Sequence, residues 1–221
     1  MLKICYGNTN RGNTELVNYL KEQKEKNKKF RVIDVGGARV GWSREVCDVL
    51  VDLNANSPGS FSFNISIQDN WNDLLNYVNI YGKFDFAICT HTIEDIVNPG
   101  LVLTMLPKIA KQGYITTPSI RAELSNVESP NWLGYIHHRH IIDHSDKKII
   151  LAPKLGFVQH LIKDQLYLDT TVEEICIFWE DTIEYEFIMN DYLGPDVNTV
   201  LNEYLKFINK SYNQVIPNKW Y

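Results

Sequence analysis

VIDVGGARVGWSREVCDVLVDLNA, residues 32–55, contains two apolar runs separated by a glycine-containing segment that is too short for an ordinary helix. The runs VIDV and DVLVDL have the composition of buried strands, and Gly36 and Gly37 follow the first. In a parallel α/β sheet, ligands bind beyond the carboxyl ends of the strands, where a glycine turn admits a ligand and an acidic residue ending the next strand holds ribose hydroxyls. Gly36, Gly37 and Asp52 meet these requirements. The spacing is not G-x-G-x-x-G, so a simple chain reversal stays an alternative.

The chain around this segment alternates strands and helices. Apolar spacing predicts, in chain order, a helix at 11–29, a strand at 61–67, a helix at 71–82, a strand at 84–90, a helix at 98–113 stopped by Gly113, and a strand at 114–118. Strands that alternate with helices are typical of a mostly parallel sheet with helices on both faces. We therefore expect an α/β fold of the Rossmann-like kind.

The second half of the chain differs in pattern. Residues 119–147 form a long polar segment with Trp, Tyr and four histidines, and we expect a functional loop on the substrate side. Residues 148–157 and 173–190 read as strands, the latter as an antiparallel hairpin around Glu180 and Asp181. Residues 196–212 have the spacing of a closing amphipathic helix.

Bulk properties limit the class of protein. The length of 221 residues fits a single domain over 1–221, with residues 1–30 as a leading helix. The net charge of -5 argues against nucleic acid as a partner, and no apolar run is long enough for a signal peptide or a membrane span. The four cysteines are scattered, which favours reduced thiols. We expect a cytoplasmic protein with a small-molecule or glycan partner; the sequence leaves the oligomeric state open.

Further motifs extend the glycine segment into a family pattern. Four stretches carry this pattern: VIDVGG, VDLN, IQDNW and FDFAICTHTIEDIVNPGLVLTMLPKIAKQGYITTPS. They resemble the class I S-adenosylmethionine-dependent methyltransferases over roughly residues 30–155. The resemblance implies a mostly parallel seven-stranded sheet with a C-terminal antiparallel hairpin, and S-adenosylmethionine as cofactor. In the stretch ICTHTIEDIVNP, His91 and Glu94 match the family, whereas Asp95 replaces a usual histidine.

The same resemblance implies the cofactor-binding residues. Asp34, Gly36 and Gly37 fall on the first motif, where Ala38 stands in a position that is often glycine. Asp52 aligns with the residue that binds the ribose, and Asp69 with the one that usually contacts the adenine amino group. The predicted cofactor set is Asp34, Gly36, Gly37, Ala38, Asp52, Leu53, Asp69 and Thr90.

The short connection after Gly37 also has a counterpart. A subset of bacterial and viral methyltransferase-like proteins, many from glycan-related gene clusters, runs from a similar first motif directly into an Asp-ended strand. That subset continues with a Thr-Pro-Ser strand and a His-Arg pair, similar to TTPSIRAEL and YIHHRHII here. The likeness favours O-methylation of a sugar or small-metabolite hydroxyl. The alternative is a non-catalytic or differently employed Rossmann-like domain in glycan assembly; a nicotinamide dehydrogenase is disfavoured because the helix start that cradles a pyrophosphate is lacking.

Methylation of a hydroxyl requires a group that accepts the hydroxyl proton, and imidazole can do so because it titrates near neutral pH. The candidates are His91 and the loop histidines His137, His138 and His140. We predict His138 as the base ahead of His91, with Arg139 holding an acidic sugar or pairing with Glu94 or Asp95.

Two further features of the loop leave alternatives open. His140 and His144 lie four residues apart and could share a metal ion with Asp143 or His137, but we favour a site without metal. The aromatic residues Trp132, Tyr135 and Trp179 could form a stacking wall for a sugar, with core packing the expected role of Trp179.

Overall fold

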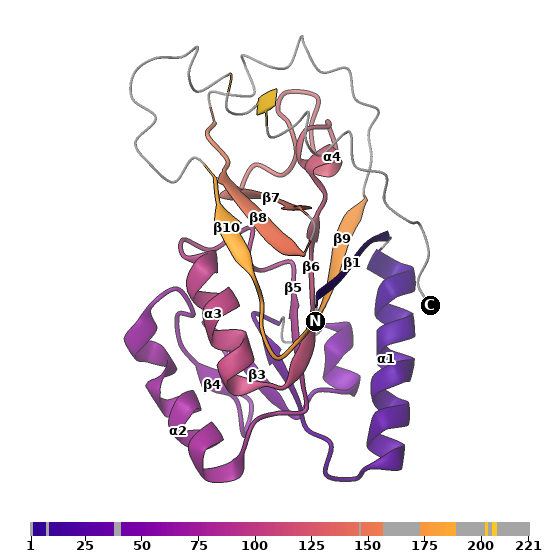
Figure 1. The fold of residues 1–221 in the computed structure, drawn as a ribbon, viewed down its shortest axis with the longest axis vertical. Helices are drawn as coiled ribbons and strands as arrows, with labels where there is room; N and C mark the ends of the chain where they lie inside the picture. Colours follow the sequence, from indigo (N-terminus) through magenta and orange to yellow (C-terminus); the bar gives the residue numbers. More distant parts are fainter. Residues whose placement is uncertain are drawn as a thin grey trace.

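The computed structural model describes residues 2–7, 9–37, 41–145, 147–156 and 173–188, together with 202, 205 and 206. Among these residues, seven strands form the main sheet in the order β1-β9-β6-β5-β2-β3-β4 (Figure 1). Their bounds are β1 Leu2–Gly7, β2 Val32–Val35, β3 Val49–Asp52, β4 Phe61–Ser62, β5 Phe86–Thr90, β6 Gln112–Pro118 and β9 Glu174–Glu180. Of these seven strands, β9 alone runs antiparallel to the other six. The predicted mostly parallel seven-stranded sheet is confirmed.

The strand order contains a topological switch point between β2 and β5. From β2 the chain proceeds outward through β3 to β4, and β5 then pairs with the other side of β2 and is followed by β6. Where the direction of winding reverses, the segments that leave adjacent strands diverge and open a crevice at the carboxyl ends. The fold therefore places any ligand site beyond the ends of β2, β3 and β5.

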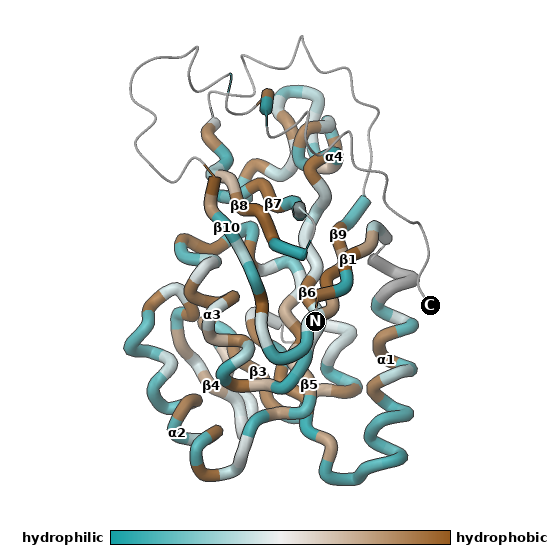
Figure 2. Tube along the Cα trace, in the orientation of Figure 1, coloured by the Kyte–Doolittle hydropathy of each residue, from teal (hydrophilic) through white to brown (hydrophobic). Residues whose placement is uncertain are grey.

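Helices cover both faces of the sheet. One face packs against α1 (Thr9–Lys26), whose Leu16 and Leu20 lie in an apolar cluster with Phe86 and Tyr114. The opposite face packs against α2 (Asn72–Tyr81) and α3 (Pro99–Ile109), and Figure 2 shows the hydrophobic strands between these hydrophilic outer surfaces. No helix among the described residues is both long and apolar enough to cross a bilayer.

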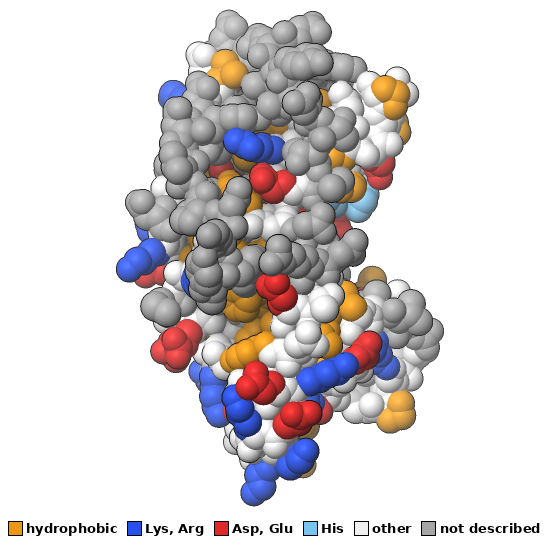
Figure 3. Space-filling model, turned by 90° about the vertical axis from the view of Figure 1, so that its right-hand side faces the viewer, with side chains coloured by type: hydrophobic (Ala, Val, Ile, Leu, Met, Phe, Trp, Pro, Cys, Tyr) orange, Lys and Arg blue, Asp and Glu red, His pale blue; other side chains and the backbone are white. Residues whose placement is uncertain are grey.

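The charged end of α1 is a mixed surface. Lys21 and Lys24 form ion pairs with Glu45 and Asp48, and Figure 3, viewed from the α1 side, shows cationic and anionic side chains interspersed. These ion pairs connect α1 to the residues of the β2–β3 connection.

The connection from β2 to β3 contains no α-helix among its described residues. It holds one four-residue 3₁₀ helix, η1 (Trp42–Glu45), and a second such helix, η2 (Gln68–Trp71), precedes α2. The short crossover expected from residues 32–55 is confirmed.

A second sheet lies beside the main one, with the order β10-β8-β7 among the described strands. Its strands are β7 His140–Ser145, β8 Lys148–Pro153 and β10 Tyr185–Phe187. The predicted hairpin over 173–190 is therefore wrong in its second half, because β9 joins the main sheet whereas β10 pairs in parallel with β8. Aromatic side chains explain the departure: Tyr185 and Phe187 pack against Gly100 of α3, which leaves no room for a methyl group at that position.

Two other local predictions need correction. Gly113 does not stop α3, which ends at Ile109; it lies inside β6, where a Cβ atom would come within 2.7 Å of the Trp179 ring and 2.4 Å of the Ala87 carbonyl. Residues 1–30 contain strand β1 ahead of the expected helix. β1 pairs with β9 from the far end of the chain, with Cys5 opposite Cys176. The predicted helix over 196–212 lies outside the described residues, apart from three positions.

Candidate functional site

A hollow of about 200 Å³ lies at the switch point. Its walls come from the segments that follow β2, β3, β4 and β5, which are the carboxyl ends of neighbouring parallel strands. The lining residues are Gly36, Asp52, Leu53, Phe63, Asn64, Ile65, His91, Thr92, Asp95 and Ile96. Three parts of the sequence pattern, at 36, at 52–53 and at 91–95, thus meet around one space.

The glycine turn after β2 is shaped by close contacts. Gly36 has a φ of +83°, and a Cβ atom there would lie 2.4 Å from the side chain of Thr92. A Cβ on Gly37 would lie 2.0 Å from a carboxylate oxygen of Asp34. Both glycines are required because the turn passes directly over side chains, which explains why the stretch reads GG.

Asp34 holds this turn from inside rather than facing the hollow. Its side chain is buried, and it accepts a hydrogen bond from the hydroxyl of Ser43 in η1. Burial raises the pKa of Asp34 to about 6, although the Ser43 hydroxyl and Arg44 act to lower it. The Asp34–Ser43 contact therefore ties the short crossover to β2.

Asp52 and Leu53, two of the residues predicted to bind the cofactor, line the hollow. Asp52 ends β3, and its carboxylate accepts a hydrogen bond from the amide of Asn54. Phe63, Asn64 and Ile65 also line the hollow, and the sequence reasoning missed them. The alternating pattern of FSFNISI predicts a strand over residues 61–67, but β4 contains only Phe61 and Ser62. The residues that follow it are therefore free to line the hollow.

The other predicted cofactor residues lie elsewhere. Asp69 is exposed in η2 and does not line the hollow. Thr90 ends β5, and its carbonyl accepts a hydrogen bond from Thr92, which is the threonine that lines the hollow. Ala38 lies outside the described residues.

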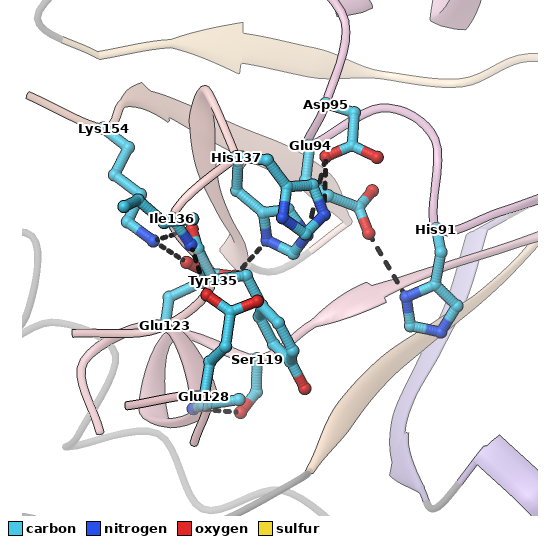
Figure 4. A network of polar contacts seen from close by, with 12 residues as sticks. His91, Glu94, Asp95, Ser119, Glu123, Glu128, Tyr135, Ile136, His137 and Lys154 are labelled. Atoms are coloured by element: carbon cyan, nitrogen blue, oxygen red, sulfur yellow. Dashed lines mark hydrogen bonds and ion pairs between the residues drawn. The ribbon is translucent and has the colours of Figure 1, made fainter. Parts of the chain in front are cut away.

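His91 lies between two acidic side chains. Its Nε2 is 2.6 Å from Glu174 of β9, and its Nδ1 is 3.3 Å from Glu94 (Figure 4 shows the latter pair). Burial by itself lowers the pKa of His91, but hydrogen bonding to Glu174 and Glu94 outweighs that effect and raises the pKa to about 10. The imidazole is therefore protonated at neutral pH and has no lone pair to accept a proton. This argues against the prediction of His91 as the base.

The predicted loop over 119–147 has more regular structure than expected. It begins with α4 (Ile120–Glu123), which Ser119 caps through its hydroxyl, and it ends in β7. Between them, Glu128 accepts hydrogen bonds from the Trp132 indole and the Ile136 amide. The loop is thus held by its own polar contacts.

The start of β7 is anchored above β5. The amides of Arg139 and His140 both donate to the carbonyl of Glu94, at 2.7 and 3.0 Å. This contact brings the histidine-rich segment to the residues that follow β5. Two segments 45 residues apart in the chain therefore form one site, which no local pattern predicts.

His138 is the most constrained of the loop histidines. Its side chain is 6% exposed, its Nδ1 lies 2.5 Å from Glu123, and its Nε2 lies 3.5 Å from Asp95. The other oxygen of Glu123 accepts a hydrogen bond from Lys154 at 2.6 Å. Because a carboxylate only accepts, Nδ1 donates the hydrogen bond to Glu123, and Nε2 faces Asp95 at a distance longer than that of a hydrogen bond.

The remaining candidates from the loop take other positions. Arg139 has an exposed side chain, and no ion pair of the described residues includes it. Trp179 is buried in the core, as expected, while Tyr135 packs against the ring of His138 with centroids 4.7 Å apart. Trp132 points its indole to Glu128.

The metal set considered from the sequence does not assemble. His140 and His144 lie in the extended strand β7, where a rise of about 3.3 Å per residue separates positions four apart by roughly 13 Å. Asp143 falls on the other face of the strand. The group of potential ligands in the described structure is instead Asp95, His137 and His138.

Comparisons with known proteins give matches to solved structures alone. No protein-family model matches the sequence, and no curated protein does. Among solved structures, the chain is similar to the N-terminal domain of EvdMO1 in the presence of SAH and D-fucose, at 8% identity and a TM-score of 0.39 over 74% of this chain and 82% of that one. It is also similar to the same domain with SAH bound, at 10% identity and a TM-score of 0.36 over 73% and 78%. The fold class rests on the strand order of this chain itself.

Proposed function

We propose that this chain is an S-adenosylmethionine-dependent methyltransferase that acts on a hydroxyl group of a sugar or another small metabolite. The observation that carries the proposal is the hollow at the switch point, where Gly36, Asp52 and Thr92 meet. These residues belong to the motifs on which the family resemblance rests. Their convergence on one space supports a shared ligand.

The hollow offers different surfaces to different parts of the cofactor. Asp52 supplies a carboxylate for the ribose hydroxyls, and Phe63 and Ile65 supply apolar surface for the adenine ring. Among the described residues of the β2–β3 connection (36–37 and 41–48), the helix is the four-residue η1, which offers little of the helix dipole that binds a dinucleotide pyrophosphate. These features favour a cofactor with one nucleoside and no phosphate.

We assign to His138 the role of accepting the proton of the hydroxyl that is methylated. A methyl group on a sulfonium is already electrophilic, so the protein must align the hydroxyl and remove its proton. Glu123 fixes His138 through Nδ1, and Nε2 faces Asp95 at the edge of the hollow. A histidine oriented by a carboxylate in this way is a recurrent proton acceptor.

Calorimetric titration with S-adenosylhomocysteine tests whether the chain binds the proposed cofactor. We expect one binding site per chain, and transfer of a labelled methyl group from S-adenosylmethionine to at least one member of a monosaccharide panel. A folded chain that binds no S-adenosylhomocysteine would favour the non-catalytic alternative. If S-adenosylhomocysteine binds but no methyl group is transferred, the cofactor assignment is retained and the tested sugars are excluded as acceptors.

A further inference from the structure

Asp95, His137 and His138 form a cluster of three potential metal ligands at the edge of the hollow, and Figure 4 labels Asp95 and His137. One ligand atom from each lies within 4.8 Å of the others. Asp95 comes from the segment after β5, and the two histidines come from the segment before β7. The proton acceptor assigned above is thus one member of a three-residue set.

The spacing inside this cluster does not suit direct hydrogen bonds. Asp95 Oδ1 is 3.5 Å from His138 Nε2 and 3.7 Å from His137 Nε2, whereas N–H···O bonds span about 2.7–3.2 Å. Within the described residues, this buried oxygen has no hydrogen-bond partner at all. Buried polar atoms are normally satisfied, so the three atoms surround a position that another group should fill.

The same spacing does suit a tetrahedral ion. Zinc binds imidazole nitrogen and carboxylate oxygen at about 2.0–2.2 Å, so neighbouring ligands of a tetrahedral site are about 3.3–3.6 Å apart. The two measured separations, 3.5 and 3.7 Å, are close to that edge length. Two imidazoles and one carboxylate also form a donor set that favours zinc and similar transition metals over magnesium.

The surroundings of His138 match those of a metal-binding histidine. Such residues commonly donate their second ring N–H to a carboxylate, which fixes the tautomer and the ring orientation. Here Glu123 accepts from Nδ1, and Lys154 holds the other carboxylate oxygen. Gly134 makes the arrangement possible, because a Cβ atom there would lie 2.5 Å from Glu123 Oε2.

We propose that Asp95, His137 and His138 bind one divalent transition-metal ion, with zinc as the best-matched metal. The ion leaves a fourth coordination position, and Asp95 places it beside the hollow. This inference deepens the proposed function and rests on it: the hydroxyl of the acceptor coordinates at the open position. A bound Zn²⁺ would lower the pKa of the coordinated hydroxyl, whose proton would pass to solvent water, and His138 would then serve as a metal ligand in place of the proton-accepting role given above.

The test is a titration of the metal-free chain with Zn²⁺ by calorimetry and with Co²⁺ by visible absorption. We expect one ion per chain and the intense absorption bands of a low-symmetry tetrahedral cobalt site. His137→Gln removes an exposed ligand without disturbing the core, and we expect metal affinity to fall at least 10-fold. Asp95→Ala should do the same, whereas the control His140→Gln, in the adjacent strand and outside the cluster, should bind as the wild type does.

Two results would overturn the inference: no stoichiometric binding of either metal, or unchanged affinity in His137→Gln. Glu123→Gln tests the supporting carboxylate, and we expect a loss of about 10-fold, at the lower end for such partners, because the amide oxygen can still accept from Nδ1. The same samples are titrated with S-adenosylhomocysteine. Binding of that ligand without metal binding would reject the metal site alone, and metal binding without it would reject the proposed function alone.

Discussion

Gly36 and Thr92 lie so close together that a Cβ atom on Gly36 would come within 2.4 Å of the threonine side chain. The contact joins the turn after β2 to the segment after β5, on the two sides of the switch point. Both residues line the hollow. The width of the candidate site is therefore set by the absence of a side chain at position 36.

Replacement of Gly36 by alanine should reduce stability and close part of the hollow. Gly59 gives a matched control, because its φ is +79° but no atom lies within 4 Å of an added Cβ. Gly59→Ala then measures the backbone cost, about 1 kcal/mol, and Gly36→Ala should exceed it by 1 kcal/mol or more because of the clash. Denaturant unfolding of both variants gives the comparison. Equal losses would show that Thr92 moves aside freely.

Asp52→Ala should weaken binding of S-adenosylhomocysteine by about 1.5–3 kcal/mol, since a charged acceptor of the ribose hydroxyls is lost. Calorimetry measures the change directly. Asp69→Ala is the control for a nearby acidic residue, because Asp69 is exposed and does not line the hollow. The family resemblance instead implies a loss for Asp69→Ala that is smaller than the loss for Asp52→Ala. Unchanged affinity in a folded Asp52→Ala variant would remove Asp52 from the site.

Ser43→Ala should destabilise the protein more at pH 8 than at pH 5. The folded pKa of Asp34, about 6, lies above its ordinary value of 3.8, so its contribution to stability is fully present below that ordinary pKa and is lost as the pH rises through about 6. Loss of the Ser43 hydroxyl leaves the ionised carboxylate unsatisfied, which costs about 1–3 kcal/mol. Melting temperatures at the two pH values test this. Ser57→Ala, which removes an exposed hydrogen bond to Arg44, should show no such difference.

His91→Gln should lower the melting temperature at pH 7, and the difference from the wild type should shrink toward pH 10. The folded pKa of His91, about 10, lies above the ordinary 6.5, so its pairing with Glu94 and Glu174 stabilises the fold fully below pH 6.5 and is lost as the pH rises through 10. A difference that stays constant from pH 7 to pH 10 would mean that His91 is neutral in the folded state.

His138→Ala should reduce turnover about 10²–10⁴-fold while cofactor affinity stays near that of the wild type. A chelator distinguishes the two possible reasons. If His138 is a metal ligand, removal of metal lowers wild-type turnover to a similar level; if His138 acts directly as the base, the chelator has no effect. Near-native turnover in a variant that melts normally would exclude both roles.

The sequence alone determined the elements whose signals are local. The alternation of short apolar strands and amphipathic helices predicted α1, α2 and the parallel strands β2, β3, β5 and β6, because burial of one face needs the same spacing wherever it occurs. The turn at Gly36 and the acidic end of β3 were equally visible, since both requirements fall within a few residues. These signals pointed to the carboxyl ends of β2, β3 and β5, where the hollow lies.

Only the tertiary structure decided what depends on distant pairs. β1 and β9 are adjacent although they lie at opposite ends of the chain, and β10 leaves the expected hairpin to pair with β8. His91 becomes a cation because Glu174 of β9 reaches it, and His138 meets Asp95 because the amides before β7 bind the Glu94 carbonyl. The protonation of a side chain depends on the charges that surround it in space, so residue type and spacing could nominate these histidines but could not assign their roles.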